Sequence, residues 1–533
     1  MSTLAVMVGG CGNYLGSELF SAIYAELLRA KSVGDSSTAD SLSRQFFTGD
    51  SAAAHGNFLK ARSLLIDMEA KTVQNCLLHQ PLPKITEVRG GCYMGRAIPK
   101  SRTRQTETGW FWDPKFAYWQ QGGCGNNWAL GHEIQGPANR DNMERLLFDL
   151  AEEADSVSSV MVLHSLAGGT GSGVGSYLTE LCADLLPGTC IASCCVWPFD
   201  AEVSTQAFNT VLSLASLQTN SDGIFIFENG RYAKILQRHA SSSTTPTAAG
   251  LSEINRCIAR DLVGCCLLPS SSAAPQTKSP SPGSSGCYHE RKREHHAPWP
   301  TTVRGLLDRD ATVALRCPLR DVLTEAAPHP AFKLLTCRYL PQTFLAERNT
   351  SRFTSYTFAS LLHRLERMFA RADTLDLLAP PSLSTPSNYR QTNYAVTQQK
   401  NRDNSRHANA KDDIHPNAAV GAQLCLRGPA ARSLEGDPTA ACEIALWPYA
   451  LSPVQISAHP FAAHGEPCSM GLTTSCRTPL PALQSTLQLG IEMLHAGAFV
   501  HHYEEFGVGF EELQAAVEQL QEIAYAYSAL GPG

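Results

Sequence analysis

One segment of the chain joins an apolar run, a glycine-rich turn and a helical pattern without interruption: VMVLHSLAGGTGSGVGSYLTEL, residues 160–181. Glycines have no Cβ, so their backbone N–H groups can approach a phosphate closely, and the start of a helix adds partial positive charge. A strand, a glycine-rich turn and a helix in this order are typical of a phosphate-binding loop. The same turn can also serve only to pack a helix tightly on a sheet, so the loop alone does not decide the function.

The first 265 residues repeat this alternation of short apolar runs and helical patterns. The strand-like runs are LAVMV, LLIDM, VMVLHSL, CIASCCVWP and GIFIFEN. Helical patterns lie at about 17–29, 142–153, 175–186, 205–217 and 251–263. Short apolar runs bounded by turn residues are typical of central strands in a parallel sheet with helices on both faces. We therefore expect an α/β nucleotide-binding domain over residues 1–265.

Beyond residue 265 we expect three further parts. Residues 266–310 contain a Ser-, Pro- and charge-rich stretch (270–300) that we interpret as a disordered insertion. An intermediate α/β domain follows at 311–480, with a strand at 332–340, a helix at 357–369 and a second low-complexity insertion near 379–417. Two helical patterns, divided near EEFGVG, fill the C-terminal part at 481–533.

The charge and hydropathy of the chain argue against two classes of partner. A formal net charge of -6 gives no basic field that would attract nucleic acid or an anionic membrane. No apolar stretch reaches the roughly 18 to 20 residues that a membrane-spanning helix needs. The N-terminus also lacks the positive residues and the cleavage pattern of a signal peptide. We therefore expect a cytosolic protein with no nucleic-acid or membrane partner.

The 18 cysteines are scattered and often lie in apolar runs. Reduced cysteine in such places behaves as a small hydrophobic residue, so we expect buried free thiols rather than disulfides. No C-x-x-C pair occurs, which removes the usual zinc framework. One group of metal-ligand residues remains, which we interpret as part of a solvated basic loop, with a zinc site as the alternative: Cys287, His289, His295 and His296.

The glycine-rich loop does not match two common phosphate-binding motifs. The chain has no Gly-Lys-Ser or Gly-Lys-Thr of a Walker loop. The spacing of the glycines does not fit G-x-G-x-x-G, which argues against a dinucleotide-dependent oxidoreductase. What remains, Gly-Gly-Thr-Gly-Ser-Gly at 168–173, resembles the fourth nucleotide-contacting loop of the tubulin family.

Other segments resemble the same family in the same order along the chain. GGCGNYLG resembles the first tubulin loop, LLIDMEA the second and GGCGNNWALGHEIQG the third. FENGRY and LSEINRCI resemble the segments whose Asn side chains contact guanine, although alone these Asn residues would be taken for caps or turns. The resemblance implies a tubulin-like α/β fold: an N-terminal Rossmann-like parallel sheet with GTPase function, a second α/β domain and a C-terminal helical hairpin.

The resemblance also implies a GTP or GDP site, residue by residue. Glu69 would hold Mg²⁺ through water, because Mg²⁺ prefers oxygen ligands. Asn126 would reach the terminal phosphate, and Asn229 and Asn255 would contact guanine. The implied nucleotide-contacting residues are Gly10, Cys11, Asn13, Asp67, Glu69, Gly125, Asn126, Ser165, Ala167, Gly168, Gly169, Thr170, Gly171, Ser172, Gly173, Gln206, Asn229 and Asn255.

Hydrolysis in the family depends on a second subunit. An acid on the helix of the seventh loop of one subunit orients water at the terminal phosphate of its longitudinal neighbour. Asp321 is the matching residue, and Glu325, one turn further along the same helix, is the alternative. The ordinary interpretation of either residue is a solvated helix carboxylate. The resemblance thus implies a GTPase site completed in trans.

Departures from α- and β-tubulin place the resemblance nearer to the δ branch. Gln206 replaces the Glu that contacts ribose, a loss on the order of 1 kcal/mol, and Leu251 replaces the aromatic residue that stacks on guanine, roughly another 0.5 to 1.5 kcal/mol. The glutamate-rich tail is also missing. The δ resemblance implies a cytoskeletal subunit at centrioles, basal bodies and cilia, where it supports triplet microtubules. Its neighbours would be other tubulins, with ε-tubulin as one candidate, and the alternative is a nucleotide-poor tubulin-like scaffold.

Overall fold

The structure is a computed structural model. It describes residues 1–48, 57–78, 108–239, 250–269, 318–342, 356–376, 417–429, 431, 444, 446–450 and 454–530. The 270–300 stretch, the Cys/His group at 287–296 and the second expected insertion lie outside these residues, except for Asn417. That residue is buried, and its side chain donates to the carbonyl of Phe369 at 2.8 Å.

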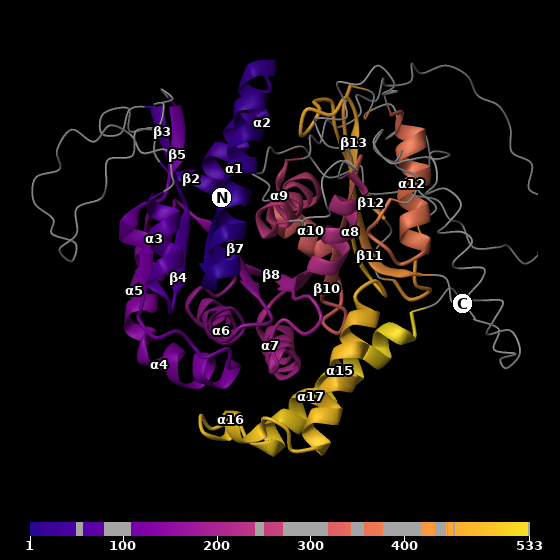
Figure 1. The fold of residues 1–533 in the computed structure, drawn as a ribbon. Helices are drawn as coiled ribbons and strands as arrows, with labels where there is room; N and C mark the ends of the chain where they lie inside the picture. The colour runs from indigo at the N-terminus through magenta and orange to yellow at the C-terminus, as the bar shows by residue number, and fades with distance from the viewer. Residues whose placement is uncertain are drawn as a thin grey trace, which may run out of the picture.

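Ten strands form one sheet that crosses the molecule, in the order β12-β11-β13-β10-β9-β8-β7-β1-β4-β6 (Figure 1). The strands from β10 to β6 all run parallel, and β13 is antiparallel to both β10 and β11. The bounds are β1 (Ser2–Val8), β4 (Ser63–Asp67), β6 (Ala117–Trp119), β7 (Val157–Ser165), β8 (Cys190–Trp197), β9 (Gly223–Glu228), β10 (Leu334–Leu340), β11 (Ala419–Arg427), β12 (Gln455–His459) and β13 (Ser469–Cys476). A separate sheet contains β2 (Phe47–Thr48), β3 (Asn57–Ala61) and β5 (Thr108–Phe111).

Helices connect most of the strands. Their bounds are α1 (Gly9–Val33), α2 (Ser36–Phe46), α3 (Ala70–Leu78), α4 (Gly136–Ala138), α5 (Arg140–Glu152), α6 (Gly175–Leu185), α7 (Gln206–Asn220), α8 (Asn229–His239), α9 (Leu251–Leu262), α10 (Pro318–Ala326), α12 (Phe358–Ala370), α15 (Leu480–His495), α16 (Val500–Glu504) and α17 (Phe510–Ser528). Three π-helical turns lie at Leu130–Gln135, Thr170–Val174 and Val263–Leu267. A short 3-10 turn lies at Pro114–Phe116.

The central strands are buried on both faces. In β1, Ala5 and Met7 pack in the core under α1 and α9, whereas Leu4 and Val6 point to the opposite core under α5 and α6. Alternate residues of a strand point to opposite faces, so a strand that is apolar throughout requires helices on both sides. The predicted α/β class with a parallel sheet is therefore confirmed.

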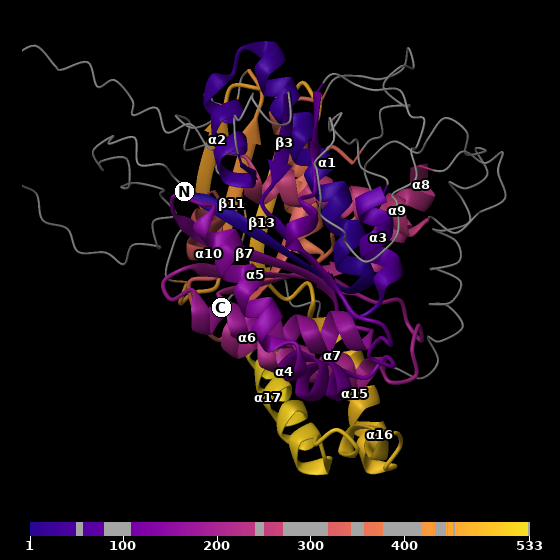
Figure 2. The same ribbon diagram turned by 90° about the vertical axis from the view of Figure 1, so that its left-hand side faces the viewer.

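The C-terminal helices form an outer layer. Helices α15 and α17 pack together against α7 and share one apolar core with it, and α16 forms the turn between them. Figure 2 shows this hairpin, in yellow, projecting beyond α6 and α7. The expected C-terminal helical region is present, although it begins at Leu480 and contains the extra short helix α16.

The first helix begins earlier than the sequence pattern predicts. We expected a helix from about Ser17, but α1 starts at Gly9, directly after β1. The reason is a close approach: a Cβ atom at Gly12 would lie 2.1 Å from the carbonyl oxygen of Leu163 in β7. Glycine has a low helix propensity, so the sequence pattern hides a helical start that tertiary packing requires.

Two expectations from composition can be compared with the described part of the chain. All fourteen cysteines there are free, which confirms the thiol prediction for these residues. Among the described helices, none is long and apolar enough to cross a membrane.

Candidate functional site

Four loops meet at the carboxyl edge of the parallel sheet, after the adjacent strands β7, β1, β4 and β6. A Cβ atom built on Gly9 would lie 3.1 Å from the backbone nitrogen of Gly171. On the β4 side, Oε1 of Glu69 lies 3.0 Å from the Cβ position of Gly123. The first, second, third and fourth sequence motifs are therefore brought together at one edge, as expected for ligand sites in parallel α/β sheets.

The glycine loop presents backbone donors at the start of a helix. Residues 166–169 lead from β7 into the π-helical turn Thr170–Val174, and α6 follows directly. Within the described part of the chain, the N–H groups of Gly168 and Gly169 have no hydrogen-bond acceptor. Unsatisfied N–H groups at the start of a helix form an anion-binding site.

Two of the three hydroxyl-bearing residues predicted to contact nucleotide, Ser165 and Ser172, bind the loop itself. Oγ of Ser172 donates to the carbonyl of Gly168 at 2.6 Å. Oγ of Ser165 accepts from the N–H of Ala167 at 3.2 Å. These two side chains thus fix the shape of the loop in this structure.

The positions in the loop are occupied by glycine for different structural reasons. A Cβ at Gly173 would lie 2.3 Å from the carbonyl oxygen of Trp128, and one at Gly171 would lie 2.9 Å from that of Ser165. Glycine is therefore needed at these two positions so that the backbone segments can pack. At half-buried Gly168, by contrast, a Cβ would lie in ordinary contact, 3.5 Å from Oδ1 of Asn126. Gly168 therefore borders the open side of the loop.

The third loop is a turn with four residues of positive φ. Gly122, Gly123, Gly125 and Asn126 have φ values of 132°, 66°, 52° and 52°. Such conformations favour glycine, and Asn tolerates them better than most residues. Asn126 is exposed with its side chain beside Gly168, where it could reach a phosphate bound by the glycine loop.

Asn209, on α7, holds the third and fourth loops together and was missed by the sequence analysis. Its Nδ2 donates to the carbonyls of Asn126 at 2.8 Å and Ala167 at 2.6 Å. Its Oδ1 accepts from the N–H of Trp128 at 2.8 Å. The side chain is fully buried. The sequence signal that could have identified Asn209 is an uncharged amide inside the apolar helix pattern QAFNTVLSLASL.

The two acids after β4 differ in their surroundings. Asp67 is buried, and its Oδ1 accepts from the N–H of Glu69 at 3.2 Å. Burial raises the pKa of Asp67 to about 6. Glu69 is exposed at the same edge. No group of three or more His, Cys, Asp or Glu side chains in the described residues is arranged to hold a metal ion directly. Two carboxylates near the open side of the loop suit a Mg²⁺ ion held through water and phosphate oxygens.

Asn13 and Cys11 lie within the first turns of α1, where they contact other parts of the protein. Nδ2 of Asn13 donates to the carbonyls of Gly9 at 2.9 Å and Ile66 at 3.0 Å, which ties the ends of β1 and β4 together. Cys11 is half-buried beside Gly10. Burial, with a smaller effect of the Glu202 charge, raises the pKa of Cys11 to about 12, so it is a neutral thiol.

Asn229 and Asn255 lie on the β9 side of the loops. Asn229 opens α8 directly after β9 and is buried, and its Oδ1 has no donor within the described residues. A buried acceptor without a donor is costly unless a ligand or water supplies one. Guanine carries such donors on N1 and its 2-amino group. Asn255 is buried in α9, which packs against α1.

Gln206 is engaged within its own loop. Its Oε1 accepts from the N–H of Val203 at 3.1 Å, and its Nε2 donates to the carbonyl of Phe199 at 3.2 Å. Leu251, at the position of the stacking aromatic residue, is 60% exposed. Gln206 therefore uses its amide within its own loop, and position 251 presents no aromatic ring.

Asp321 lies at the opposite edge of the sheet. Helix α10 packs on the first residue of β9, because a Cβ at Gly223 would lie 2.5 Å from Cδ2 of Leu323. Figure 2 places α10 on the same side as the start of β1. Asp321 is exposed, and burial, followed by the charge of Asp321, raises the pKa of Glu325. One molecule therefore does not bring this acid to its own glycine loop.

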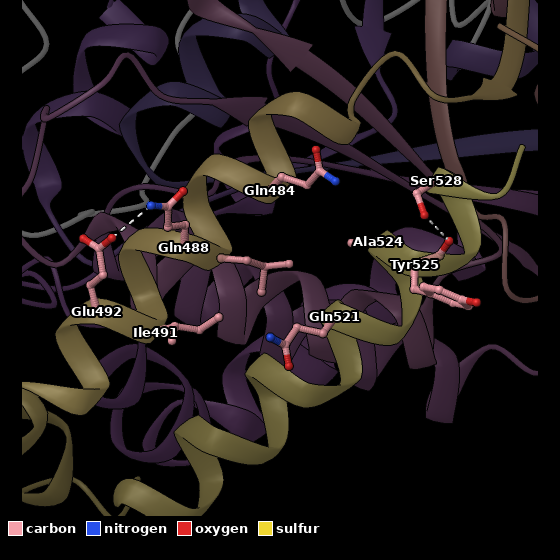
Figure 3. Close-up of a pocket in the computed structure, with 9 residues that line it drawn as sticks. Gln484, Gln488, Ile491, Glu492, Gln521, Ala524, Tyr525 and Ser528 are labelled. Carbon is pink, nitrogen blue, oxygen red and sulfur yellow. Dashed lines mark hydrogen bonds between the residues drawn. The ribbon is translucent and has the colours of Figure 1, made fainter. Parts of the chain in front are cut away.

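A groove on the outer hairpin lies apart from the loops. It has a volume of about 510 Å³ and lies between α15 and α17, where amide and apolar side chains line it (Figure 3). Gln488 donates to Glu492 across one turn of α15 at 3.0 Å. The lining includes no glycine-rich phosphate-binding turn, so we do not place the nucleotide here.

His132 connects the third loop to α6. Its ring stacks on Trp128 with 4.2 Å between centroids, and its two nitrogens lie 2.8 Å from Oε1 of Glu133 and 3.0 Å from Oε1 of Glu180. Burial opposes the charge, but the hydrogen bonds and charges of the two glutamates outweigh it and raise the pKa of His132 to about 9. At neutral pH an imidazolium therefore ties the loop to the helix.

Comparisons with known proteins agree with this arrangement. Residues 2–237 match the family model described as Tubulin/FtsZ family, GTPase domain. The chain is 24% identical to the mouse tubulin delta chain over 552 residues, which cover 100% of both chains. It is 23% identical to the human tubulin delta chain over 549 residues, 99% of this chain and 100% of that protein. The mouse tubulin epsilon chain matches at 27% over 248 residues, 44% of this chain and 46% of that protein.

The charged state of His132 predicts a pH-dependent stability. A pKa raised above the ordinary value of 6.5 gives stability that is fully present below about pH 6.5 and is lost as the pH rises through about 9. Between about pH 7 and pH 10, the free energy of unfolding of the native protein should fall by about 2 kcal/mol more than that of His132→Gln. Urea denaturation at both pH values measures this difference, and equal declines would show that His132 is not charged.

Proposed function

We propose that the protein binds GTP and GDP at the carboxyl edge of its sheet and acts as a δ-tubulin-like subunit of a microtubule-type polymer. Two comparisons support this proposal: residues 2–237 match the Tubulin/FtsZ GTPase domain family model, and the whole chain is similar to tubulin delta chains. The observation that carries this proposal is the pair of unsatisfied N–H groups at Gly168 and Gly169, where β7 leads into a helix.

The phosphates account for most of the proposed binding. The free N–H groups and the α6 end of the loop favour negative charge, and Asn126 stands on the open side. Glu69 would hold Mg²⁺ through water, and Asp67 would share that role in its ionised form. When bound, the metal ion would neutralise phosphate charge. The other predicted residues of the first and fourth loops shape the site rather than contact charge.

The base would be read by amides. Asn229 offers a buried acceptor to the N1 and 2-amino donors of guanine, which adenine lacks at these positions. This favours a guanine nucleotide over NAD, whose binding fingerprint is also missing from the chain. Since Gln206 is engaged locally and Leu251 is exposed, we expect weaker nucleotide binding than conventional tubulin subunits have. A nucleotide-poor scaffold is the second candidate function.

A valine at position 168 tests the proposed site. Gly168→Val places a branched side chain on the open side of the loop, so guanine nucleotide binding should fall at least about a hundredfold, while the fold is kept. Nucleotide released from denatured protein is identified by chromatography, and Gly490→Ala, whose Cβ meets only Val211 at 3.8 Å, is the control.

GDP or GTP from the native protein and the control, but not from Gly168→Val, supports the proposal. NAD would support an oxidoreductase, and a native protein without any nucleotide would support the scaffold. Normal binding by Gly168→Val would mean that the phosphates bind elsewhere.

Hydrolysis, where it occurs, would be completed by a neighbour. We propose that Asp321 orients water at the terminal phosphate of the next subunit, because the two sites lie at opposite edges of the sheet. In assembled protein, Asp321→Ala should slow GTP hydrolysis about a hundredfold. Nucleotide binding by the isolated variant should not change.

Glu325→Ala is the matched control for Asp321→Ala. Glu325 is the other acid of the same helix, and it is partly buried. Phosphate release from assembled protein distinguishes the two residues. Slow GTP hydrolysis by Glu325→Ala, with normal hydrolysis by Asp321→Ala, would exchange the roles of the two acids. Loss of nucleotide from the isolated Asp321→Ala variant would contradict action in trans.

The similarity to δ chains also supports a place in the cell. We propose that the protein acts at centrioles and basal bodies, supports triplet microtubules and cilium formation, and has other tubulins, ε-tubulin among them, as neighbours. Antibody labelling of the endogenous protein in ciliated cells should mark basal bodies. Uniform labelling along cytoplasmic microtubules would contradict the δ-type role.

A further inference from the structure

Tyr503 connects the outer hairpin to the nucleotide loops. It lies on α16, the short helix between α15 and α17, and is fully buried. Its hydroxyl donates to Oδ1 of Asn209 at 2.7 Å, with the carbonyl oxygen of Thr205 3.3 Å away as a second acceptor. The edge of its ring packs against Phe208 at 5.5 Å between centroids. Burial raises the pKa of Tyr503, so the hydroxyl remains a donor.

The hydrogen bond from Tyr503 completes the set of partners around the Asn209 amide. Both hydrogens of Nδ2 are donated to loop carbonyls, those of Asn126 and Ala167. Oδ1 accepts two hydrogen bonds, from the N–H of Trp128 and from Tyr503. An amide has two donor hydrogens and two acceptor positions, so the orientation of Asn209 is fully determined. Without Tyr503, one buried acceptor position is empty.

A second contact from the same helix reaches the same loop. Nδ2 of Asn127 donates to the backbone carbonyl of His502 at 2.7 Å. Its Oδ1 accepts from the N–H groups of Ala129 at 2.8 Å and Leu130 at 3.3 Å, which closes the turn after the third loop. Two adjacent residues of α16 therefore reach the third loop, His502 directly through its carbonyl and Tyr503 through Asn209.

We propose that Tyr503 is a positioning residue for the nucleotide site: through Asn209 it sets the distance between the Asn126 turn and the glycine loop, and so couples the outer helical hairpin to nucleotide binding. This inference rests on the proposed function of that site. Coupling between two sites is reciprocal, so bound nucleotide should in turn restrain α16.

The chain offers a matched control in Tyr527. This tyrosine is also buried in the apolar core of the hairpin, and its hydroxyl accepts from the N–H of Leu334 at 2.9 Å and bonds Oγ of Ser475 at 3.0 Å. Its ring packs against Phe332. Tyr527 contacts β10 and β13 but none of the nucleotide loops. Tyr527→Phe therefore removes a comparable buried hydroxyl at a similar cost in stability.

The test measures the release of a fluorescent GDP analogue from the full-length protein. Tyr503→Phe keeps the ring and its contact with Phe208, so the fold should survive. The loss of one buried hydrogen bond should raise the dissociation rate of the nucleotide about fivefold, whereas Tyr527→Phe should leave this rate unchanged. In hydrogen exchange, added nucleotide should protect residues 499–505 in the native protein and less so in Tyr503→Phe.

Equal release rates for the two variants, or a normal rate for Tyr503→Phe, would overturn the inference and leave Tyr503 a core residue only. Should the native protein bind no guanine nucleotide, the proposed function fails, and exchange of the backbone amides of 125–128 still decides the positioning role. Faster exchange of these amides in Tyr503→Phe than in Tyr527→Phe supports it. Equal exchange in the two variants overturns it.

Discussion

The site depends on backbone segments that approach one another too closely for any side chain. A Cβ at Gly12 would meet the carbonyl of Leu163 at 2.1 Å, and one at Gly169 would meet that of Cys124 at 2.5 Å. A Cβ at Gly131 would lie 2.4 Å from the carbonyl of Gly169. Real Cβ atoms do not come this close to backbone atoms, so these contacts set the relative places of α1, the third loop and the glycine loop. The free N–H groups and the asparagine contacts follow from that arrangement.

The elements that could be predicted from sequence are those whose burial is uniform. Strands β1 and β7 and helices α6 and α9 agree with the predicted segments within a few residues, because an apolar run or a regular apolar face carries the whole signal. The prediction missed helices α2 and α3, strands β6, β11, β12 and β13, and the small sheet of β2, β3 and β5. Strands β2, β3, β5 and β6 are only two to five residues long, and long-range pairing rather than local pattern defines them.

The residues of the candidate site also fall into those that could be predicted from sequence and those that could not. The glycine loop and the acids after β4 were predicted because the motif itself carries the chemistry. Asn209 and Tyr503 were not, because each acts through a partner far away in the sequence, and only the fold brings the two together. Residues that the motif predicts to have the same function have different functions in the structure. Gly171 and Gly173 avoid collisions, Gly168 borders open space, and the amide of Gln206 is used by its own loop.

The position of α10 has a consequence for assembly. The proposed nucleotide site at one edge of the sheet and the proposed acid at the other cannot both be used in a twofold dimer, in which the same patch faces itself. Only head-to-tail stacking satisfies both, and such stacking gives a ring where the rotation between neighbours closes and an open filament where it does not. The two tips of the resulting filament would then differ chemically: one would present a bound nucleotide without its acid, and the other an acid without a nucleotide.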